Sequence, residues 1–180
     1  AALRLNGKRA GSRINKGRCR LPCTLGRVAK MPDQRMTDAA LTAEIQRKAA
    51  ALRVKHTAPL IVICLPTFNP PLDLLRQQIE SLRAQTHHAW LCSISDDAST
   101  EAHLAAIKEL IAGDERFVLS PAAERLGVYH NVERCLQLAP TQAEFVALAD
   151  QDDRWYPHKL ARLLAEFNPA ARSDIQLVYS

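Results

Sequence analysis

The feature that most constrains the fold is an unbroken apolar run, Leu60-Ile61-Val62-Ile63-Cys64-Leu65, which is followed by Pro66. A strand with one solvent-facing side alternates apolar and polar residues, so this run predicts a strand that is buried on both faces and ends at Pro66. Further apolar runs at 90–95, 117–119, 145–149 and 177–179 alternate with segments of helical periodicity. This alternation predicts an α/β domain with a mainly parallel sheet.

The charge is distributed unevenly along the chain. The net charge of +5 combines +11 over residues 1–58 with −6 over residues 59–180. Residues 1–36 are rich in Arg, Lys and Gly without periodicity, which predicts a disordered tail. Residues 37–58 are predicted to form a helix and a linker, and residues 59–180 the domain. A basic tail can contact nucleic acid or an anionic membrane surface. We expect no nucleic-acid partner. Two alternatives stay open for the tail: peripheral contact with a membrane, or an extension that has no partner.

Hydropathy and cysteine usage indicate the compartment. No apolar run approaches the ~18 residues of a membrane helix, and no apolar segment of a signal peptide follows the basic N-terminus. We expect a cytoplasmic protein, or one at the inner face of the membrane. Cys64 and Cys92 lie in apolar runs and are predicted to be reduced, small hydrophobic residues. Cys19 and Cys23 have no second Cys/His pair beside them, which argues against a zinc site.

The two ends of the chain suggest a fragment. The sequence begins at Ala1 rather than at a methionine, and its last apolar run reaches almost to Ser180. We therefore expect a domain that is truncated after its fifth strand.

Three polar clusters follow predicted strands. They are Pro66-Thr67-Phe68-Asn69, Asp96-Asp97-Ala98-Ser99-Thr100 and Asp150-Gln151-Asp152-Asp153. Ligands of open α/β sheets bind outside the carboxyl ends of the strands. If the strands are parallel, all three clusters lie at that edge.

The third cluster predicts a metal site. Asp150, Asp152 and Asp153 repel one another unless a cation lies among them. Hard oxygen ligands suit Mg²⁺ or Mn²⁺, which commonly complete their coordination with substrate phosphates. A diphosphate-linked substrate would fit. The alternative is a solvated acidic turn at the start of the helix that begins at Pro157.

The other polar residues allow two interpretations each. Of Asp96 and Asp97, one can accept a hydrogen bond from a base N–H, and the other can bind a sugar hydroxyl or a backbone amide; alternatively, Asp97, Ser99 or Thr100 can cap a helix. Gly127 can permit close backbone approach and Arg125 can meet a phosphate, or both belong to an ordinary loop. The sequence has no G-x-G-x-x-G after the first strand, no P-loop and no G-x-S-x-G elbow.

Taken together in this order, the clusters resemble family 2 glycosyltransferases of the GT-A fold. The resemblance covers about residues 59–180 and includes Leu126-Gly127 to Asn131. The stretch from Asp150 to Leu160 is most similar to bacterial rhamnosyltransferase-type members, which build cell-surface polysaccharide. The resemblance implies a Rossmann-like, mainly parallel sheet flanked by helices.

The resemblance also implies residue roles. Pro66, Thr67 and Asn69 would line the nucleotide pocket, and Asp97 would bind the base. Asp150 and Asp152 would form the D-x-D motif, with Asp152 on the metal and Asp150 near the ribose or the metal's waters. Arg125 would belong to the nucleotide site as well, in a loop where many members have Asn.

The implied reaction is inverting transfer of a sugar from a dTDP- or UDP-linked donor to a saccharide or lipid-linked acceptor. The base and acceptor site would lie beyond the last predicted strand, so no catalytic base is named. We expect the chain to bind donor weakly without transferring sugar. The alternatives are an inactive truncated remnant, a non-catalytic binding module, or a sugar nucleotidyltransferase. The last would usually carry a Gly-rich, basic loop after the first strand.

Overall fold

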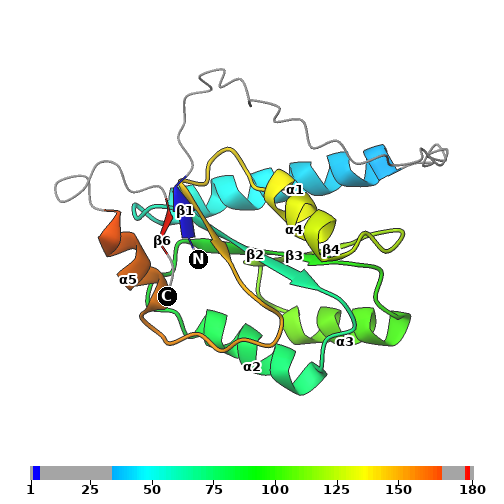
Figure 1. The fold of residues 1–180 in the computed structure, drawn as a ribbon. Coiled ribbons are helices and arrows are strands. Elements are labelled where there is room, and N and C mark those ends of the chain that lie inside the picture. The colour runs from blue at the N-terminus through cyan, green and yellow to red at the C-terminus, as the bar shows by residue number, and fades with distance from the viewer. Residues whose placement is uncertain (1, 5–33, 168–176, 179–180) are drawn as a thin grey trace, which may run out of the picture.

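The computed structural model of the protein describes residues 2–4, 34–167 and 177–178. In these ranges the strands are β1 (Ala2–Arg4), β2 (Ile61–Thr67), β3 (Trp90–Asp96), β4 (Phe117–Pro121), β5 (Phe145–Leu148) and β6 (Leu177–Val178). The helices are α1 (Gln34–Lys55), α2 (Leu72–Arg83), α3 (Glu101–Ile111), α4 (Val128–Gln137) and α5 (Lys159–Glu166) (Figure 1). No helix in the described ranges is long and apolar enough to cross a membrane.

The strands form one sheet in the order β4-β3-β2-β5-β1-β6. β2 pairs in parallel with β3 on one side and with β5 on the other, and β3 pairs in parallel with β4. The predicted α/β class with a mainly parallel sheet is confirmed. β3 and β4 lie on one side of β2, whereas β5 lies on the other side. The sheet therefore has a switch point between β2 and β5. Switch points open a crevice at the carboxyl ends of the strands.

Helices cover both faces of the sheet. In Figure 1, α1 and α4 lie on one face, and α2 and α3 lie on the other. Ile61, Ile63 and Leu65 of β2 join one hydrophobic cluster with residues of α2, α3 and α5, whereas Val62 and Cys64 join a second cluster with residues of α1 and α4. Side chains of a strand point alternately to opposite faces, so a strand covered on both sides must be apolar throughout.

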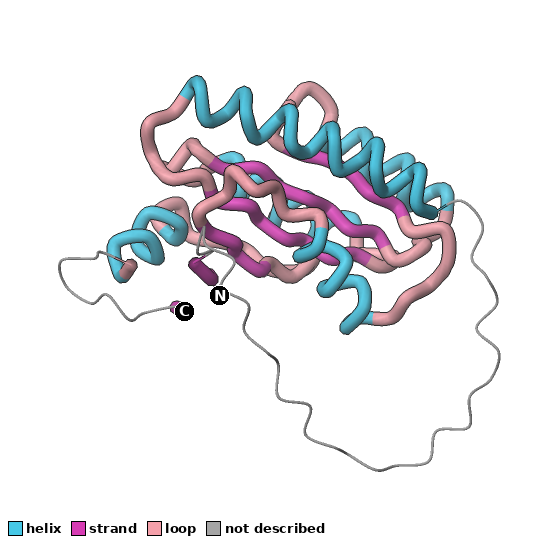
Figure 2. Tube along the Cα trace, turned by 90° about the horizontal axis from the view of Figure 1, so that it is seen from above, coloured by secondary structure: helices cyan, strands magenta, loops and turns pink. Residues whose placement is uncertain are grey.

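Helix α1 belongs to this core. Its Ile45 and Ala49 are completely buried, and Leu41 and Leu52 pack beside them at helical spacing. Figure 2 shows the long helix running along the strands of the sheet. The helix predicted for residues 37–54 is therefore confirmed, and it packs on the same sheet as the elements that follow residue 59.

The N-terminal segment differs in part from the prediction of a disordered tail. Residues 2–4 form β1, which pairs antiparallel with β5 and β6, and residues 34–36 belong to α1. A three-residue strand carries no readable periodicity, and its pairing depends on β5, which is remote in sequence. Residues 5–33, with Cys19 and Cys23, lie outside the described ranges. The predicted fifth strand, described at 177–178, pairs with β1 rather than with β5.

The first strand does not end at Pro66, as the sequence predicted, but continues to Thr67. The carbonyl of Cys64 accepts a hydrogen bond from the N–H of Ala149, so the backbone polar groups of Cys64 point toward β5. The backbone of Pro66, two positions further along the strand, faces the same side. The pairing with β5 ends at Cys64 and Leu148, so no partner on that side needs the N–H that proline lacks.

The described cysteines are small apolar groups of the core, as predicted for two of them. Cys64, Cys92 and Cys135 are buried and free. A hydrogen bond with Cys135 and burial raise the pKa of the Cys64 thiol, and burial raises the pKa of Cys92. Cys64 and Cys92 therefore stay protonated at neutral pH.

Candidate functional site

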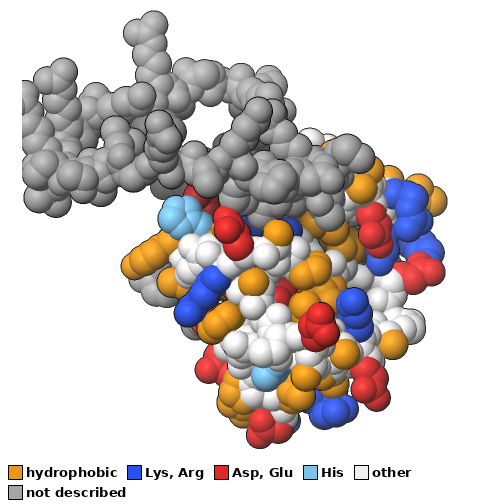
Figure 3. Space-filling model, turned by 90° about the vertical axis from the view of Figure 1, so that its right-hand side faces the viewer, with side chains coloured by type: hydrophobic (Ala, Val, Ile, Leu, Met, Phe, Trp, Pro, Cys, Tyr) orange, Lys and Arg blue, Asp and Glu red, His pale blue; other side chains and the backbone are white. Residues whose placement is uncertain are grey.

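The three polar clusters meet at the carboxyl edge of the sheet. Thr67 ends β2 and Asp96 ends β3, and the two are register partners. Asp150 follows β5 by two residues. Figure 3 views the molecule from the side toward which β2 points in Figure 1, where acidic, basic and hydrophobic side chains are mixed. The prediction that these clusters share one edge is confirmed.

Asp96 organises the junction of the first two clusters. Its side chain is completely buried, and its Oδ1 accepts hydrogen bonds from Thr67 Oγ1 at 3.0 Å and from Ser99 Oγ at 2.6 Å. Its Oδ2 accepts the backbone N–H of Ser99 at 2.8 Å. The side chains of Asp96 and Thr67 are thus hydrogen-bonded to each other inside the protein. The carbonyl of Thr67 also accepts the N–H of Asp97 at 2.8 Å, and the place of Thr67 in the nucleotide pocket stays a prediction.

Asn69 connects the loop after β2 to the start of α3. Its backbone N–H donates to Ser99 Oγ at 2.7 Å, and its Oδ1 accepts the N–H of Thr100 at 3.0 Å. Its φ of 38° lies in the left-handed region, which asparagine tolerates better than most residues. Thr100 caps α3 by accepting the N–H of His103, which confirms one of the capping interpretations. Pro66 is half-buried and lies in β2, just before this loop.

Asp97 holds the loop that carries Arg125. Its side chain is 3% exposed, and its two oxygens accept the N–H groups of Leu126 at 2.5 Å and of Gly127 at 3.0 Å. A carboxylate has about four acceptor positions, so two remain after these bonds. Asp97 therefore binds backbone amides, one of the alternatives that the sequence left open for this aspartate pair, and its contact with a base stays a prediction.

Arg125 lies against the loop after β2. Its guanidinium carbon is 4.1 Å from the centre of the Phe68 ring, in the geometry of a cation–π contact. The guanidinium is exposed at the same edge as Asp150, as its predicted place in the nucleotide site requires, although no contact with a ligand tests that role.

The acidic loop presents its carboxylates to solvent. Asp150, Asp152 and Asp153 are exposed, and the N–H of Asp153 donates to the carbonyl of Asp150 at 3.4 Å. Among the described residues, no three His, Cys, Asp or Glu side chains converge as a metal site would require. The expectation that the three aspartates surround a cation is therefore not met by this arrangement.

Asp150 and Asp152 nevertheless fit a metal that binds together with its substrate. Among the described residues, neither carboxylate has a hydrogen-bond or ion-pair partner, so both are available as ligands. Mg²⁺ and Mn²⁺ prefer such oxygens, and Mg²⁺ is usually held by one or two carboxylates plus substrate phosphates. A two-carboxylate edge suits an ion that arrives with a diphosphate.

Two glutamines, to which the sequence assigned no role, hold the acidic loop and the segment that follows it. Gln151 Oε1 accepts the N–H of Phe68 at 2.9 Å. Gln85, buried at the end of α2, donates to the carbonyl of Tyr156 at 2.8 Å and accepts the N–H of Leu160 at 3.1 Å. The sequence carried no signal for Gln85, because its burial depends on the packing of the segment 156–160 against α2.

A second buried network lies beneath the site. Asn131 of α4 accepts a hydrogen bond from Ser95 Oγ at 2.6 Å and donates to the carbonyl of Ser95 at 2.9 Å. Arg134 donates to Ser95 Oγ at 2.8 Å and to the carbonyl of Ser120 at 2.9 Å. These contacts join α4 to the carboxyl ends of β3 and β4. Asn131 belongs to the stretch that resembles the glycosyltransferase family, but its position in the sequence did not show whether its role is structural or in binding.

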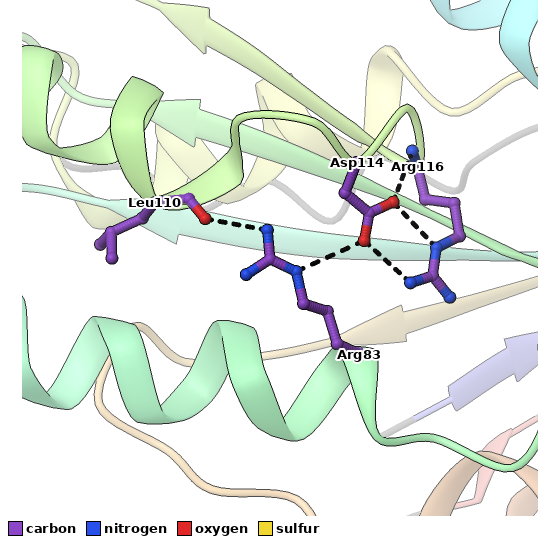
Figure 4. A network of polar contacts seen from close by, with 4 residues as sticks. All are labelled: Arg83, Leu110, Asp114 and Arg116. Atoms are coloured by element: carbon purple, nitrogen blue, oxygen red, sulfur yellow. Dashed lines mark hydrogen bonds and ion pairs between the residues drawn. The ribbon is translucent and has the colours of Figure 1, made fainter.

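A hollow of about 430 Å³ lies at the opposite end of the strands and contains none of the predicted site residues. Residues of α1 and of the loop 113–116 line it. Figure 4 shows how this loop is held: Asp114 accepts two hydrogen bonds from the Arg116 guanidinium, at 2.9 and 2.8 Å, and one from Arg83 at 3.4 Å. Arg83 also donates to the carbonyl of Leu110 at 2.9 Å. The lining of the hollow is mainly basic and includes none of the three polar clusters, so we place the candidate site at the carboxyl edge.

Comparison with known protein families shows which family the chain belongs to. The sequence description of glycosyl transferase family 2 matches residues 62–177, which is more than half of the chain and includes all three clusters. The chain belongs to this family. The predicted resemblance is thereby confirmed at family level.

Among curated proteins, the chain is 30% identical over 106 residues to TuaG of Bacillus subtilis (strain 168), which bears the name of a teichuronic acid biosynthesis glycosyltransferase. The match covers 59% of this chain and 41% of TuaG. The chain spans between 9% and 41% of the lengths of the curated relatives that it matches.

Solved structures show the same fold. S. aureus TarS 1–349 in complex with UDP-GlcNAc matches with a TM-score of 0.54 at 20% identity, over 61% of this chain and 31% of that chain. The mannosyltransferase PcManGT from Pyrobaculum calidifontis, in complex with GDP-Man and Mn²⁺, matches with a TM-score of 0.52 at 19% identity, over 74% of this chain and 44% of that chain. At these identities the likeness establishes the fold alone.

Proposed function

We propose that the chain is the donor-binding part of a metal-dependent, inverting glycosyltransferase that acts in cell-surface polysaccharide synthesis. The observation that carries the proposal is the carboxyl edge at the switch point between β2 and β5. There Asp150 and Asp152 are exposed beside the loops that carry Asn69 and Arg125. Membership of the family and the name of the relative TuaG support the reaction class.

Each residue of the site has a proposed task. Residues 66–69 would line the nucleoside pocket with Arg125 beside them, and Asp97 would bind the base. Asp152 would hold Mg²⁺ or Mn²⁺, and Asp150 would lie near the ribose or the metal's waters. When bound, the ion would supply charge stabilisation to the diphosphate leaving group. The described residues provide binding and orientation; we assign none of them the role of base.

The donor is proposed to be a dTDP- or UDP-linked sugar, with rhamnose as the sugar favoured by the stretch from Asp150 to Leu160. The acceptor is proposed to be a saccharide or a lipid-linked saccharide. The two solved relatives carry UDP-GlcNAc and GDP-Man. A test of base preference must therefore include GDP.

Thermal unfolding of the whole chain with different nucleotides tests the proposal. A ligand that binds only the folded protein raises Tm, and the rise grows with the logarithm of the ligand concentration divided by Kd. We expect dTDP or UDP with Mn²⁺ to raise Tm, and Mn²⁺ alone or the matching monophosphate to raise it much less. A protein whose Tm responds to no nucleoside diphosphate would contradict the proposal, and a response to GDP alone would contradict the proposed donor.

A further inference from the structure

Gln151 lies between the two exposed aspartates and faces the other way. Its side chain is half-buried, whereas Asp150 and Asp152 are exposed. Its Oε1 accepts the backbone N–H of Phe68 at 2.9 Å. Within three consecutive residues, the outer two therefore offer carboxylates to solvent while the middle one bonds to the loop after β2.

This hydrogen bond is the central attachment of the acidic loop. The loop is anchored before it by the bond from Ala149 N–H to the Cys64 carbonyl, at 2.9 Å, and after it by the bond from Trp155 N–H to Ser81 Oγ, at 3.0 Å. Among the described residues, the Phe68 N–H supplies the one hydrogen bond that joins residues 150–153 to another segment. Without it, the stretch between the two anchors would be restrained only by its own turn.

Phe68 also contacts the loop of Arg125. Its ring lies 4.1 Å from the Arg125 guanidinium carbon, and the carbonyl of its neighbour Thr67 accepts the N–H of Asp97 at 2.8 Å. Gln151 thus ties the acidic loop to the residue that touches the proposed nucleoside side of the site. The position of the carboxylates is fixed relative to that side through a single side chain.

We propose that Gln151 is a positioning residue that couples the two halves of the donor site. It holds Asp150 and Asp152 where a metal-bound diphosphate can be bound at the same time as the nucleoside. This inference rests on the proposed function. Because a loop that is ordered beforehand loses less entropy when the ligand binds, Gln151 should strengthen the metal-dependent part of nucleotide affinity. It should contribute little to metal-free affinity.

The test compares three variants of the whole chain with the wild type. Gln151→Met has similar length and removes the acceptor, Gln151→Glu keeps an acceptor oxygen, and Gln77→Met makes the same change at an exposed position of α2. Calorimetric titration with UDP and dTDP, with and without Mn²⁺, gives the gain in affinity due to the metal. Amide hydrogen exchange at Phe68 and the Tm report the local bond and the global fold.

We expect Gln151→Met to lower the metal-dependent gain about fivefold, as the loss of one net hydrogen bond would do. Exchange at Phe68 should become faster, while Tm and metal-free affinity stay near the wild-type values. Gln151→Glu and Gln77→Met should keep at least the wild-type gain.

Three results would overturn the inference. If the wild type shows a gain and Gln151→Met keeps all of it, Gln151 does not position the carboxylates, although the proposed function stands. If Gln151→Met lowers Tm and metal-free affinity together, its role is only structural. If the wild type shows no gain with Mn²⁺, the proposed function fails and the inference fails with it.

Discussion

Asp96 and Asp97 are neighbours in the chain, yet they serve different parts of the site. Asp96 binds Thr67 and Ser99, so it closes the loop after β3 onto β2. Asp97 binds the N–H groups of Leu126 and Gly127, so it attaches the loop of Arg125. Both carboxylates are buried. Buried charges are stable only with such hydrogen bonds, and these bonds fix the geometry that a ligand would meet.

Replacement of Asp97 should destabilise the protein in the absence of any ligand. Asp97→Ala leaves two backbone N–H groups without an acceptor and should lower the free energy of unfolding by about 1–3 kcal/mol. Asp97→Asn keeps one acceptor oxygen and should lose less. Urea denaturation measures both. An unchanged midpoint for Asp97→Ala, equal to that of the exposed control Asp153→Ala, would show that the two bonds contribute nothing.

At the scale of the elements, the loop between α3 and β4 is held by a network of one carboxylate and two guanidinium groups (Figure 4). Burial alone would raise the pKa of Asp114, but hydrogen bonds from Arg116 and Arg83 outweigh it and hold the pKa below its usual value. Arg116 also lies over the Trp90 ring, with 4.0 Å between its guanidinium carbon and the ring centre. The loop is thereby joined to the first residue of β3.

The lowered pKa of Asp114 predicts a stability that depends on pH. The folded state favours the ionised carboxylate, so its contribution is complete above the unfolded pKa of about 3.9 and disappears as pH falls through the lower folded pKa. Asp114→Asn should lower the free energy of unfolding at pH 7 by about 1–3 kcal/mol. The difference from the wild type should shrink below pH 4.

Urea denaturation at pH 7, 5 and 3.5 measures this dependence. Glu115→Gln serves as the control because Glu115 is the exposed neighbour of Asp114. If Asp114→Asn and Glu115→Gln follow the same pH profile, the network does not stabilise the fold.

Helix α1 should be required for the stability of the sheet. Ile45 is completely buried between α1 and the strands, so Ile45→Ala removes apolar contacts and leaves a cavity. We expect a loss of about 2–5 kcal/mol in the free energy of unfolding. Val54→Ala, on the exposed side of the same helix at 89% exposure, should change little. Equal effects of the two variants in thermal unfolding would mean that α1 is not part of the core.

The elements show what the sequence could predict and why the rest stayed hidden. The apolar run before Pro66 predicted a doubly buried strand because burial on both faces leaves no place for polar residues. The pairing of β1 with β5 was not predictable, because a three-residue strand owes its structure to a partner more than a hundred residues away. Pro66 predicted the end of β2. The strand continues through it because the pairing of β2 with β5 stops at Cys64 and Leu148, which only the tertiary structure shows.

At the scale of the whole molecule, parallel strands bring three separate clusters to one edge, and the sequence predicted this meeting from the expected parallel direction of the strands. It could not predict which polar side chains turn inward. Asp97 was a candidate only by position and Gln151 had no assigned role, and their bonds to Gly127 and Phe68 depend on how the loops return across the edge. The hollow of about 430 Å³ at the opposite edge contains none of these residues.

The central claim is that this edge binds a nucleoside diphosphate together with a divalent ion, and that Asp152 is the ligand to the ion. Isothermal titration of the whole chain with UDP and dTDP, with and without Mn²⁺, tests it most directly when wild type, Asp152→Asn and the neighbouring control Asp153→Asn are compared. We predict that Mn²⁺ raises the nucleotide affinity of the wild type and of Asp153→Asn but not that of Asp152→Asn. The same gain in Asp152→Asn, or no gain in a folded wild type, would contradict the account.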